Sequence, residues 1–185
     1  MTSPDRGDFR LLGWRRLARG VFLRFHRQHL IGGDGTPVTR DVVRHPGGVG
    51  ILAIEGDRVW FVTQRRAPFG SEVMEIPAGR LDPGDRTPEE AARRELLEEL
   101  GATASEWTAL GEMLPSPGYS DEVIHLFAAQ GLSFGDRRPD GSEERQAALV
   151  PLPAAEALLR IGTGDLTDAK TQLALLLWDR KRRVG

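Results

Sequence analysis

The sequence predicts an α/β protein with a short leading antiparallel sheet and a main α/β body. Apolar runs bounded by glycine, proline and aspartate recur along the chain, which is the pattern of strands and hairpins. One strongly marked helix is expected at residues 88–100, and two more at about 153–161 and 167–182. The length of 185 residues suits a main domain with an appendage, which we expect at 47–185 and 1–46.

The leading sheet is expected to contain two strands, Val21–Gln28 and Val38–His45, joined by the turn-rich sequence IGGDGTP. A lone hairpin is barely stable in water. It must therefore pack on the main domain or on a second subunit, which makes a homodimer a reasonable hypothesis.

The main sheet is expected to begin with the hairpin of Gly50–Ile54 and Arg58–Thr63, which flank the turn sequence Glu55-Gly56-Asp57. Residues 64–74 are expected to be loop or edge, and the proline and glycine in residues 75–79 to bar regular structure. The last helix is expected to be capped by Thr167. Further strands are expected near Trp107–Leu114, Val123–Ala129 and Ala147–Pro151.

The helix at 88–100 carries the clearest local signals. Thr87, Pro88 and Glu90 fit the N-cap, N1 and N3 positions of a capping box, and Gly101 suits the end of the helix. At 3.6 residues per turn, three carboxylates crowd one face and three leucines lie opposite. The carboxylates are those of Glu95, Glu98 and Glu99, and the leucines are Leu96, Leu97 and Leu100. Such crowding repels unless a cation lies there, so the pattern predicts a magnesium site.

Composition excludes several classes of function. A net charge of −2 argues against a general nucleic-acid or membrane binder, and the lack of cysteine excludes a disulfide framework and a thiolate nucleophile. No stretch approaches 18 uncharged apolar residues and no secretion signal is visible, so we expect a cytoplasmic protein.

The stretch from Gly79 to Ala102 resembles the signature of the Nudix hydrolases, G-x5-E-x7-R-E-U-x-E-E-x-G-U with U aliphatic. The part from Arg94 onward matches, apart from alanine as the final apolar residue. Asp85 stands where the first glutamate is expected, with one extra residue before Arg94. The resemblance implies an α/β/α sandwich with a mixed sheet that cleaves nucleoside diphosphate derivatives.

The same resemblance implies which groups hold the metal. Glu95 and Glu99 are the principal ligands, Glu98 an additional one, the carbonyl of Ala78 the main-chain ligand, and Asp85 a further candidate. Oxygen ligands of this kind suit Mg²⁺, and Mn²⁺ is possible. Arg94 has two compatible interpretations, an i,i+4 partner of Glu98 and a group that orients a metal-binding glutamate.

Segments outside the signature resemble the ADP-ribose pyrophosphatases within that family. These are the stretch from Thr39 to Ile54, Gln64–Arg66, and Ser116–Glu122, whose Pro117 lies 15 residues beyond Ala102. The resemblance implies hydrolysis of ADP-ribose to AMP and ribose 5-phosphate, with Arg66, Pro117 and Arg40 as substrate contacts. GDP-mannose as the substrate, or an ADP-ribose-binding Nudix module without catalysis, remain alternatives.

The catalytic base is expected among three glutamates. The family places a catalytic glutamate in the acidic loop where this chain has Glu143 and Glu144. That stretch can equally be a plain polar loop. In that case Glu95, or a metal-bound hydroxide alone, is expected to do the work of the base.

Overall fold

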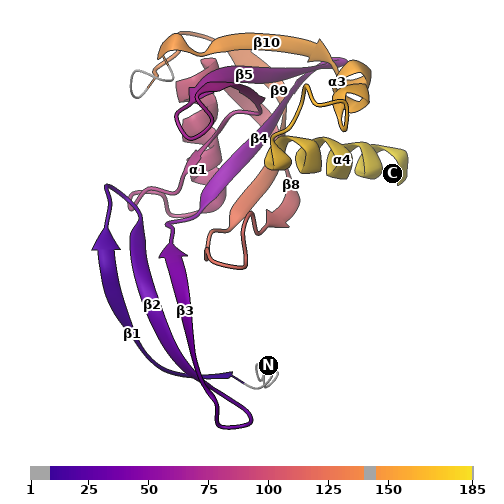
Figure 1. The fold of residues 1–185 in the computed structure, drawn as a ribbon. Helices are drawn as coiled ribbons and strands as arrows, with labels where there is room; N and C mark the ends of the chain where they lie inside the picture. The colour runs from indigo at the N-terminus through magenta and orange to yellow at the C-terminus, as the bar shows by residue number, and fades with distance from the viewer. Residues whose placement is uncertain (1–8, 140–144, 185) are drawn as a thin grey trace. The chain divides into compact units, whose positions relative to one another are not determined.

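The computed structural model describes residues 9–139 and 145–184, so Glu143 and Glu144 lie outside the described residues. The chain divides into two compact units. The main unit contains Gly47–Pro115 and the chain from Val123 onward, and the second contains the residues up to Pro46 together with Ser116–Glu122. Figure 1 shows the elements of both units along the chain.

The main unit is built on a seven-stranded mixed sheet with a central path β10-β5-β4-β9-β8. The parallel pair β4–β9 lies between antiparallel neighbours, as the resemblance implied. Short strand β6 pairs with β5, and β7 pairs with β4. The bounds are β4 Gly48–Glu55, β5 Arg58–Arg66, β6 Ser71–Glu75, β7 Ala78–Arg80, β8 Ala102–Met113, β9 Ile124–Phe134 and β10 Ala148–Pro153.

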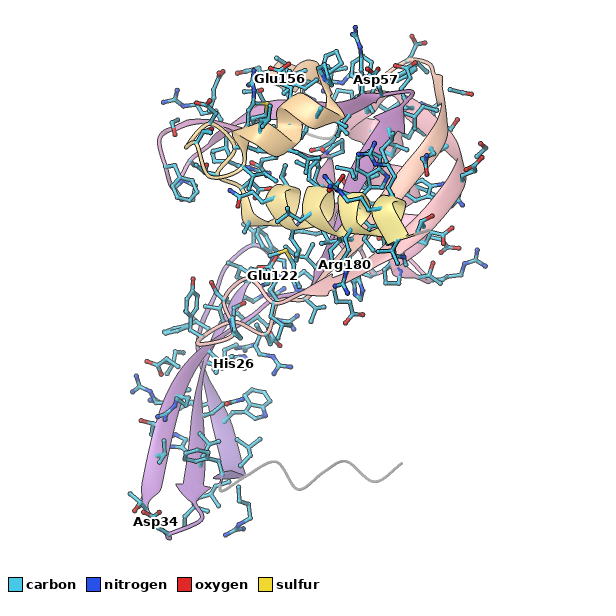
Figure 2. The ribbon with its side chains drawn as sticks, turned by 90° about the vertical axis from the view of Figure 1, so that its right-hand side faces the viewer. His26, Asp34, Asp57, Glu122, Glu156 and Arg180 are labelled. Carbon is cyan, nitrogen blue, oxygen red and sulfur yellow. The ribbon has the colours of Figure 1, made fainter. Side chains whose placement is uncertain are left out.

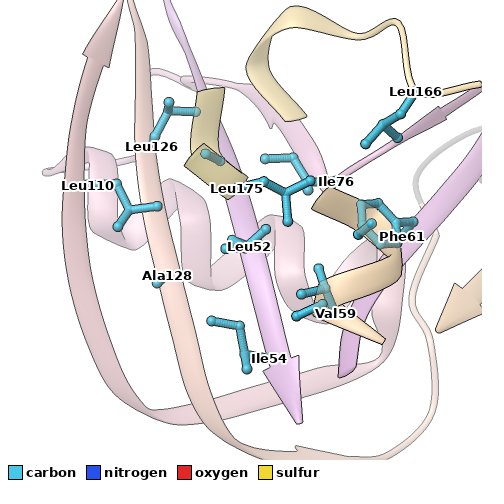
Figure 3. Packing of buried hydrophobic residues seen from close by; sticks show 13 residues of the cluster. Leu52, Ile54, Val59, Phe61, Ile76, Leu110, Leu126, Ala128, Leu166 and Leu175 are labelled. Carbon is cyan, nitrogen blue, oxygen red and sulfur yellow. The ribbon is translucent and has the colours of Figure 1, made fainter. Parts of the chain in front are cut away.

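Helices cover both faces of this sheet, which confirms the sandwich. Side chains alternate across β4, so Leu52 and Ile54 join one apolar cluster while Ile51 and Ala53 join the other. The first cluster packs against α3 (Ala154–Arg160) and α4 (Ala169–Val184), and Figure 3 shows its buried side chains. The second cluster packs against α1 (Pro88–Glu95) and the following turn.

One expectation about the main sheet is confirmed in one of its alternatives, and one needs correction. Of loop or edge, the stretch 64–74 is largely edge, because β5 continues to Arg66 and turns back as the edge strand β6. Residues after Pro77 are not irregular, since Ala78–Arg80 pair with the start of β4. In both places a neighbouring strand supplies hydrogen-bond partners for the backbone groups, and the local sequence does not show that this neighbour will be present.

The second unit contains a three-stranded antiparallel sheet in the order β1-β2-β3. Its strands are β1 Phe9–Arg19, β2 Arg24–Gly32 and β3 Pro37–Arg44. The two expected strands are present, but β1 was missed because two register shifts break its period-two pattern. The β2–β3 turn is held by Asp34, labelled in Figure 2, whose carboxylate accepts the Thr36 N–H at 2.9 Å.

The loop of Ser116–Glu122 is bonded to β3 within this second unit. The Val43 N–H donates to the Tyr119 carbonyl at 2.7 Å, and the Asp121 N–H donates to the Val43 carbonyl at 3.2 Å. The Asp121 carboxylate also accepts the His45 N–H at 2.8 Å. The segment that carries Pro117 is therefore hydrogen-bonded to the N-terminal sheet and belongs to the same unit.

The first and last helices both begin at a side-chain N-cap, but the cap of the last helix is not the expected residue. The first helix is capped by Thr87, as expected. The last helix begins at Ala169 and is capped by Asp168 instead of Thr167, because the Asp168 carboxylate accepts the Thr171 N–H at 3.0 Å. Within the described chain, no helix has the length and apolar character needed to cross a bilayer.

Candidate active site

The acidic helix is fixed at its start by half of the expected capping box. The Thr87 hydroxyl accepts the Glu90 N–H at 3.2 Å. The Glu90 carboxylate does not reach back to Thr87 but accepts the Arg86 N–H at 2.9 Å. The Glu90 side chain thus binds the N–H of the residue before the N-cap, where the standard capping box uses the N–H of the N-cap residue itself.

The end of the same helix departs from α geometry. Residues Leu96–Leu100 form one wide π-helical turn, η1, which ends at Gly101 with a φ of 68°. A π turn bonds residue i to residue i+5 and frequently marks a functional site. Glu95 and Glu99, expected one α-helical turn apart, lie against the neighbouring residues Gly79 and Ala78, and Leu96 and Leu100 are buried as expected.

Glu99 is the most deeply buried of the three carboxylates, with 2% of its surface exposed. One oxygen accepts the Gln64 side-chain amide at 2.6 Å, and the other accepts the Ala78 N–H at 2.9 Å. A buried carboxylate is stable only when such donors replace water. Ala78 thus contacts the acidic site through its N–H, and Gln64 is a contact that the sequence did not reveal.

Glu95 lies against the backbone of Gly79 and is also buried. A Cβ added to Gly79 would overlap the Glu95 carboxylate, so the end of the Glu95 side chain can lie here only because residue 79 is glycine. One Glu95 oxygen accepts Arg94 Nη1 at 2.6 Å. The strand–helix approach at Gly79 is the reason that the acidic side chain can sit directly on β7.

Arg94 gathers the remaining acidic groups. Its Nη1 donates to Glu98 at 3.0 Å, and its Nη2 donates to Asp85 at 3.1 Å and to the Arg80 carbonyl at 3.0 Å. Burial disfavours the charged guanidinium, but the hydrogen bond to Asp85 and the charges of Glu95 and Glu98 outweigh it and raise the Arg94 pKa. Arg94 is therefore both an i,i+4 partner of Glu98 and a group that orients Glu95.

Asp85 faces Arg94 and its own loop. One oxygen accepts the Asp82 N–H at 2.8 Å, and the hydrogen bond with Arg94 lowers the Asp85 pKa below its usual value. Its observed contacts are those of a residue that holds Arg94 and closes the loop before the helix.

A second ionic network lies at the end of β5 and the start of α4. The buried Glu75 carboxylate accepts Arg66 Nε and Nη2 at 2.6 and 2.9 Å and also pairs with Lys170. Burial alone would raise the Glu75 pKa, but these two cations outweigh it and lower the pKa. Lys170 also donates to Asp168 at 3.0 Å. These four residues line a pocket of about 510 Å³ beside Phe69.

Comparison with known proteins decides the family. Residues 44–170 match the NUDIX domain. The chain belongs to the Nudix family. It is 35% identical over 143 residues to the ADP-ribose pyrophosphatase of Bacillus subtilis, covering 77% of each chain. It is 37% identical over 143 residues to the methanol dehydrogenase activator of Bacillus methanolicus, again covering 77% of each.

Two further matches extend this result. The GDP-mannose pyrophosphatase of Yersinia enterocolitica is 34% identical over 157 residues, which covers 79% of this chain and 81% of that protein. A solved structure described as an ADP compounds hydrolase superposes with a TM-score of 0.83 over 98% of each chain at 22% identity. At that identity the superposition shows a shared fold, which includes the small N-terminal sheet.

The acidic residues of this Nudix chain fit a divalent cation in their chemistry. Four carboxylates, those of Asp82, Asp85, Glu95 and Glu98, lie within 3.9 Å of the single positive charge of Arg94, so the cluster keeps a net negative charge. The atoms of this cluster that could bind a cation are all carboxylate oxygens, which suits Mg²⁺ and Mn²⁺. Across residues 9–139 and 145–184, no three acidic or histidine side chains already stand in a metal-holding arrangement.

The structure divides the expected site residues into groups. Glu95, Glu98 and Asp85 meet around Arg94, while Glu99 meets Ala78. Arg66 is held by Glu75 in the pocket described above. Arg40 and Pro117 are both exposed and belong to the N-terminal unit. Arg40 lies 6.0 Å from the centre of the Phe9 ring and donates to the Thr39 carbonyl at 2.9 Å.

We expect Gly79→Ala to destabilise the Nudix protein by about 1–3 kcal/mol, because the added methyl group must push the buried Glu95 carboxylate out of its hydrogen bond with Arg94. Gly84→Ala is the matched control, since nothing lies within 4 Å of the Cβ position there. Urea unfolding of both variants measures the difference. Equal stability of the two variants would contradict the close packing of Glu95 on Gly79.

Proposed function

We propose that this Nudix protein hydrolyses the diphosphate bond of ADP-ribose to AMP and ribose 5-phosphate with Mg²⁺, Mn²⁺ being a possible substitute. The observation that carries the proposal is the pair of buried glutamates, Glu95 and Glu99, held against β7 at the end of a matching Nudix helix. Buried acids of this kind are costly unless they serve a bound cation or a fixed hydrogen-bond network.

The choice of ADP-ribose rests on two observations. The sequence of Ser116–Glu122, with Pro117 at its spacing from the Nudix signature, resembles the loop of ADP-ribose pyrophosphatases. The Bacillus subtilis relative that is 35% identical carries that activity in its name. We propose Pro117 and Arg40 as substrate contacts on this basis.

In this mechanism Glu95, Glu99 and Glu98 would hold the cation with the Ala78 carbonyl, and Asp85 is a further candidate ligand. When bound, a divalent cation neutralises charge on the diphosphate oxygens and acts as a Lewis acid. Arg94 keeps Glu95 and Glu98 oriented, through contacts of 2.6 and 3.0 Å. Arg66, positioned by Glu75, would donate charge-assisted hydrogen bonds to the diphosphate.

The reaction adds water across one phosphorus–oxygen bridge bond. A base removes a proton from the attacking water, its oxygen bonds to phosphorus, and the bridging oxygen leaves with the other phosphate. We propose Glu143 or Glu144 as this base, with Glu95 as the alternative, because the family places a catalytic glutamate in that loop.

We also propose that the protein is a cytoplasmic homodimer joined through its N-terminal sheet. Large apolar side chains of β1 are exposed there: Phe9, Leu11, Leu12 and Trp14 are each at least half exposed. Such a surface on a small sheet is typical of a subunit contact. Light scattering at micromolar concentration is expected to give twice the chain mass, and the mass of one chain would contradict the proposal.

GDP-mannose is the second candidate substrate, favoured by the relative of Yersinia enterocolitica that is 34% identical. A further alternative is a module that binds ADP-ribose without cleaving it. The complete acidic part of the Nudix helix argues for catalysis, since a binding module has no need of this full set of carboxylates.

We expect the purified protein with Mg²⁺ to release AMP from ADP-ribose, and Glu99→Gln to reduce kcat about 10³-fold, since the metal supplies several kcal/mol of transition-state stabilisation. Glu89→Gln is the matched control, because Glu89 is a partly exposed acid of the same helix that forms an ion pair with Arg93, away from the acidic cluster around Arg94. An equal loss in both variants would contradict a metal-binding role for Glu99. Turnover of GDP-mannose alone would overturn the substrate, and binding of ADP-ribose without AMP release would favour the binding module.

We expect either Glu143→Gln or Glu144→Gln to lower kcat by 10²–10⁴-fold, roughly the contribution of a positioned general base. The affinity for Mn²⁺ should stay unchanged, because neither residue is a proposed ligand. The measurement is the pH dependence of kcat in each variant. Full activity of both variants would transfer the role of base to Glu95.

A further inference from the structure

The segment Glu75–Gly79, which carries the Ala78 contact to Glu99, is held at three successive positions. The Ile76 N–H donates to the Thr171 hydroxyl at 2.9 Å. The Pro77 carbonyl accepts the Ile51 N–H at 2.8 Å, and the Ala78 N–H donates to Glu99 at 2.9 Å. One bond therefore comes from α4, one from β4 and one from the acidic helix.

The bond from α4 has a defined direction. A threonine hydroxyl has one hydrogen to donate, and an ionised carboxylate can only accept. The Thr171 hydroxyl lies 2.5 Å from an Asp168 oxygen, so it donates there and offers a lone pair to the Ile76 N–H. Asp168 is in turn held by Lys170 at 3.0 Å, and Thr171 is completely buried.

This arrangement joins the start of α4 to the acidic site through the backbone. The Ile76 peptide is two residues before Ala78, whose N–H fixes one oxygen of Glu99, and three residues before Gly79, on which Glu95 rests. Lys170 pairs with Glu75 and so holds the side chain of the same segment. The start of the short segment is thus tied twice to residues 168–171, although these lie about 90 residues away in the sequence.

We propose that Thr171 is a positioning residue for the metal site: its hydroxyl, oriented by Asp168, fixes the Ile76 peptide and thereby the Ala78 backbone against which Glu99 is held. The inference rests on the metal site in the proposed function and adds α4 to the elements that set its geometry. Without the hydroxyl, the buried Ile76 N–H loses its partner, and the segment must shift to find another.

The test compares Thr171→Val, which keeps the shape but removes the hydroxyl, with Thr171→Ser, which keeps the hydroxyl. Binding of Mn²⁺ to the full chain is measured by the loss of the free-ion electron paramagnetic resonance signal. We expect Thr171→Val to weaken Mn²⁺ binding roughly tenfold, the scale found for groups that orient metal ligands, and Thr171→Ser to stay within about twofold. Backbone amide exchange without metal should accelerate at Ile76 and Ala78 in the valine variant alone.

Two controls separate positioning from general loss of stability. Thr163→Val removes an exposed hydroxyl that donates to the Arg160 carbonyl at 2.9 Å, and should leave Mn²⁺ binding unchanged. Leu110→Ala makes a cavity in the cluster beside α4 and lowers Tm without touching the network. All variants are compared well below their unfolding temperatures.

The outcomes are distinct. If Leu110→Ala weakens Mn²⁺ binding as much as Thr171→Val, or if Thr171→Val binds like the wild type, the positioning role is wrong. Glu99→Gln is measured alongside. If it weakens binding while Thr171→Val does not, only this inference fails. If Glu99→Gln has no effect, the proposed metal site itself is wrong and the inference falls with it, whatever the ADP-ribose assay gives.

Discussion

The hydrogen bond from the Ala78 N–H to the buried Glu99 carboxylate is the contact on which the rest of the site depends. It ties the acidic helix to strand β7, and the pairing of β7 with β4 ties both to the centre of the sheet. Because a buried carboxylate without donors is costly, the segment around Ala78 has little freedom to move. The tight fit of Glu95 on Gly79 follows from the same close approach of helix and strand.

Two ionic networks surround this contact and differ in charge balance. Around Arg94 four carboxylates face one guanidinium, which leaves the negative charge that suits a divalent cation. Around Glu75 two cations share a carboxylate, with Asp168 as a second acceptor for Lys170. We propose that the first network holds a metal and that the second presents Arg66 to an anionic substrate. Both are buried enough for hydrogen bonds to fix side-chain positions.

Much of this could be predicted from the sequence because the signals are local. Thr87 and Gly101 mark the ends of the acidic helix, and the hairpin at Gly56 marks the first strands. The sequence was a poorer guide where pairing between distant segments decides whether a strand forms. Strand β6 forms because β5 offers it a ladder, and β1 was missed because bulges interrupt its alternation. The cap of α4 is Asp168 and not Thr167, a choice between neighbours that propensity cannot make.

The sequence by itself determined the family, the sandwich class and the acidic residues, since a helix signature keeps its spacing wherever it folds. Only the tertiary structure decided the partners of these acids. Gln64 is 35 residues from Glu99, and Thr171 is 95 residues from Ile76. Such contacts depend on the register of β4, β5 and β7 and on the helix packed against them, and no local pattern records that register.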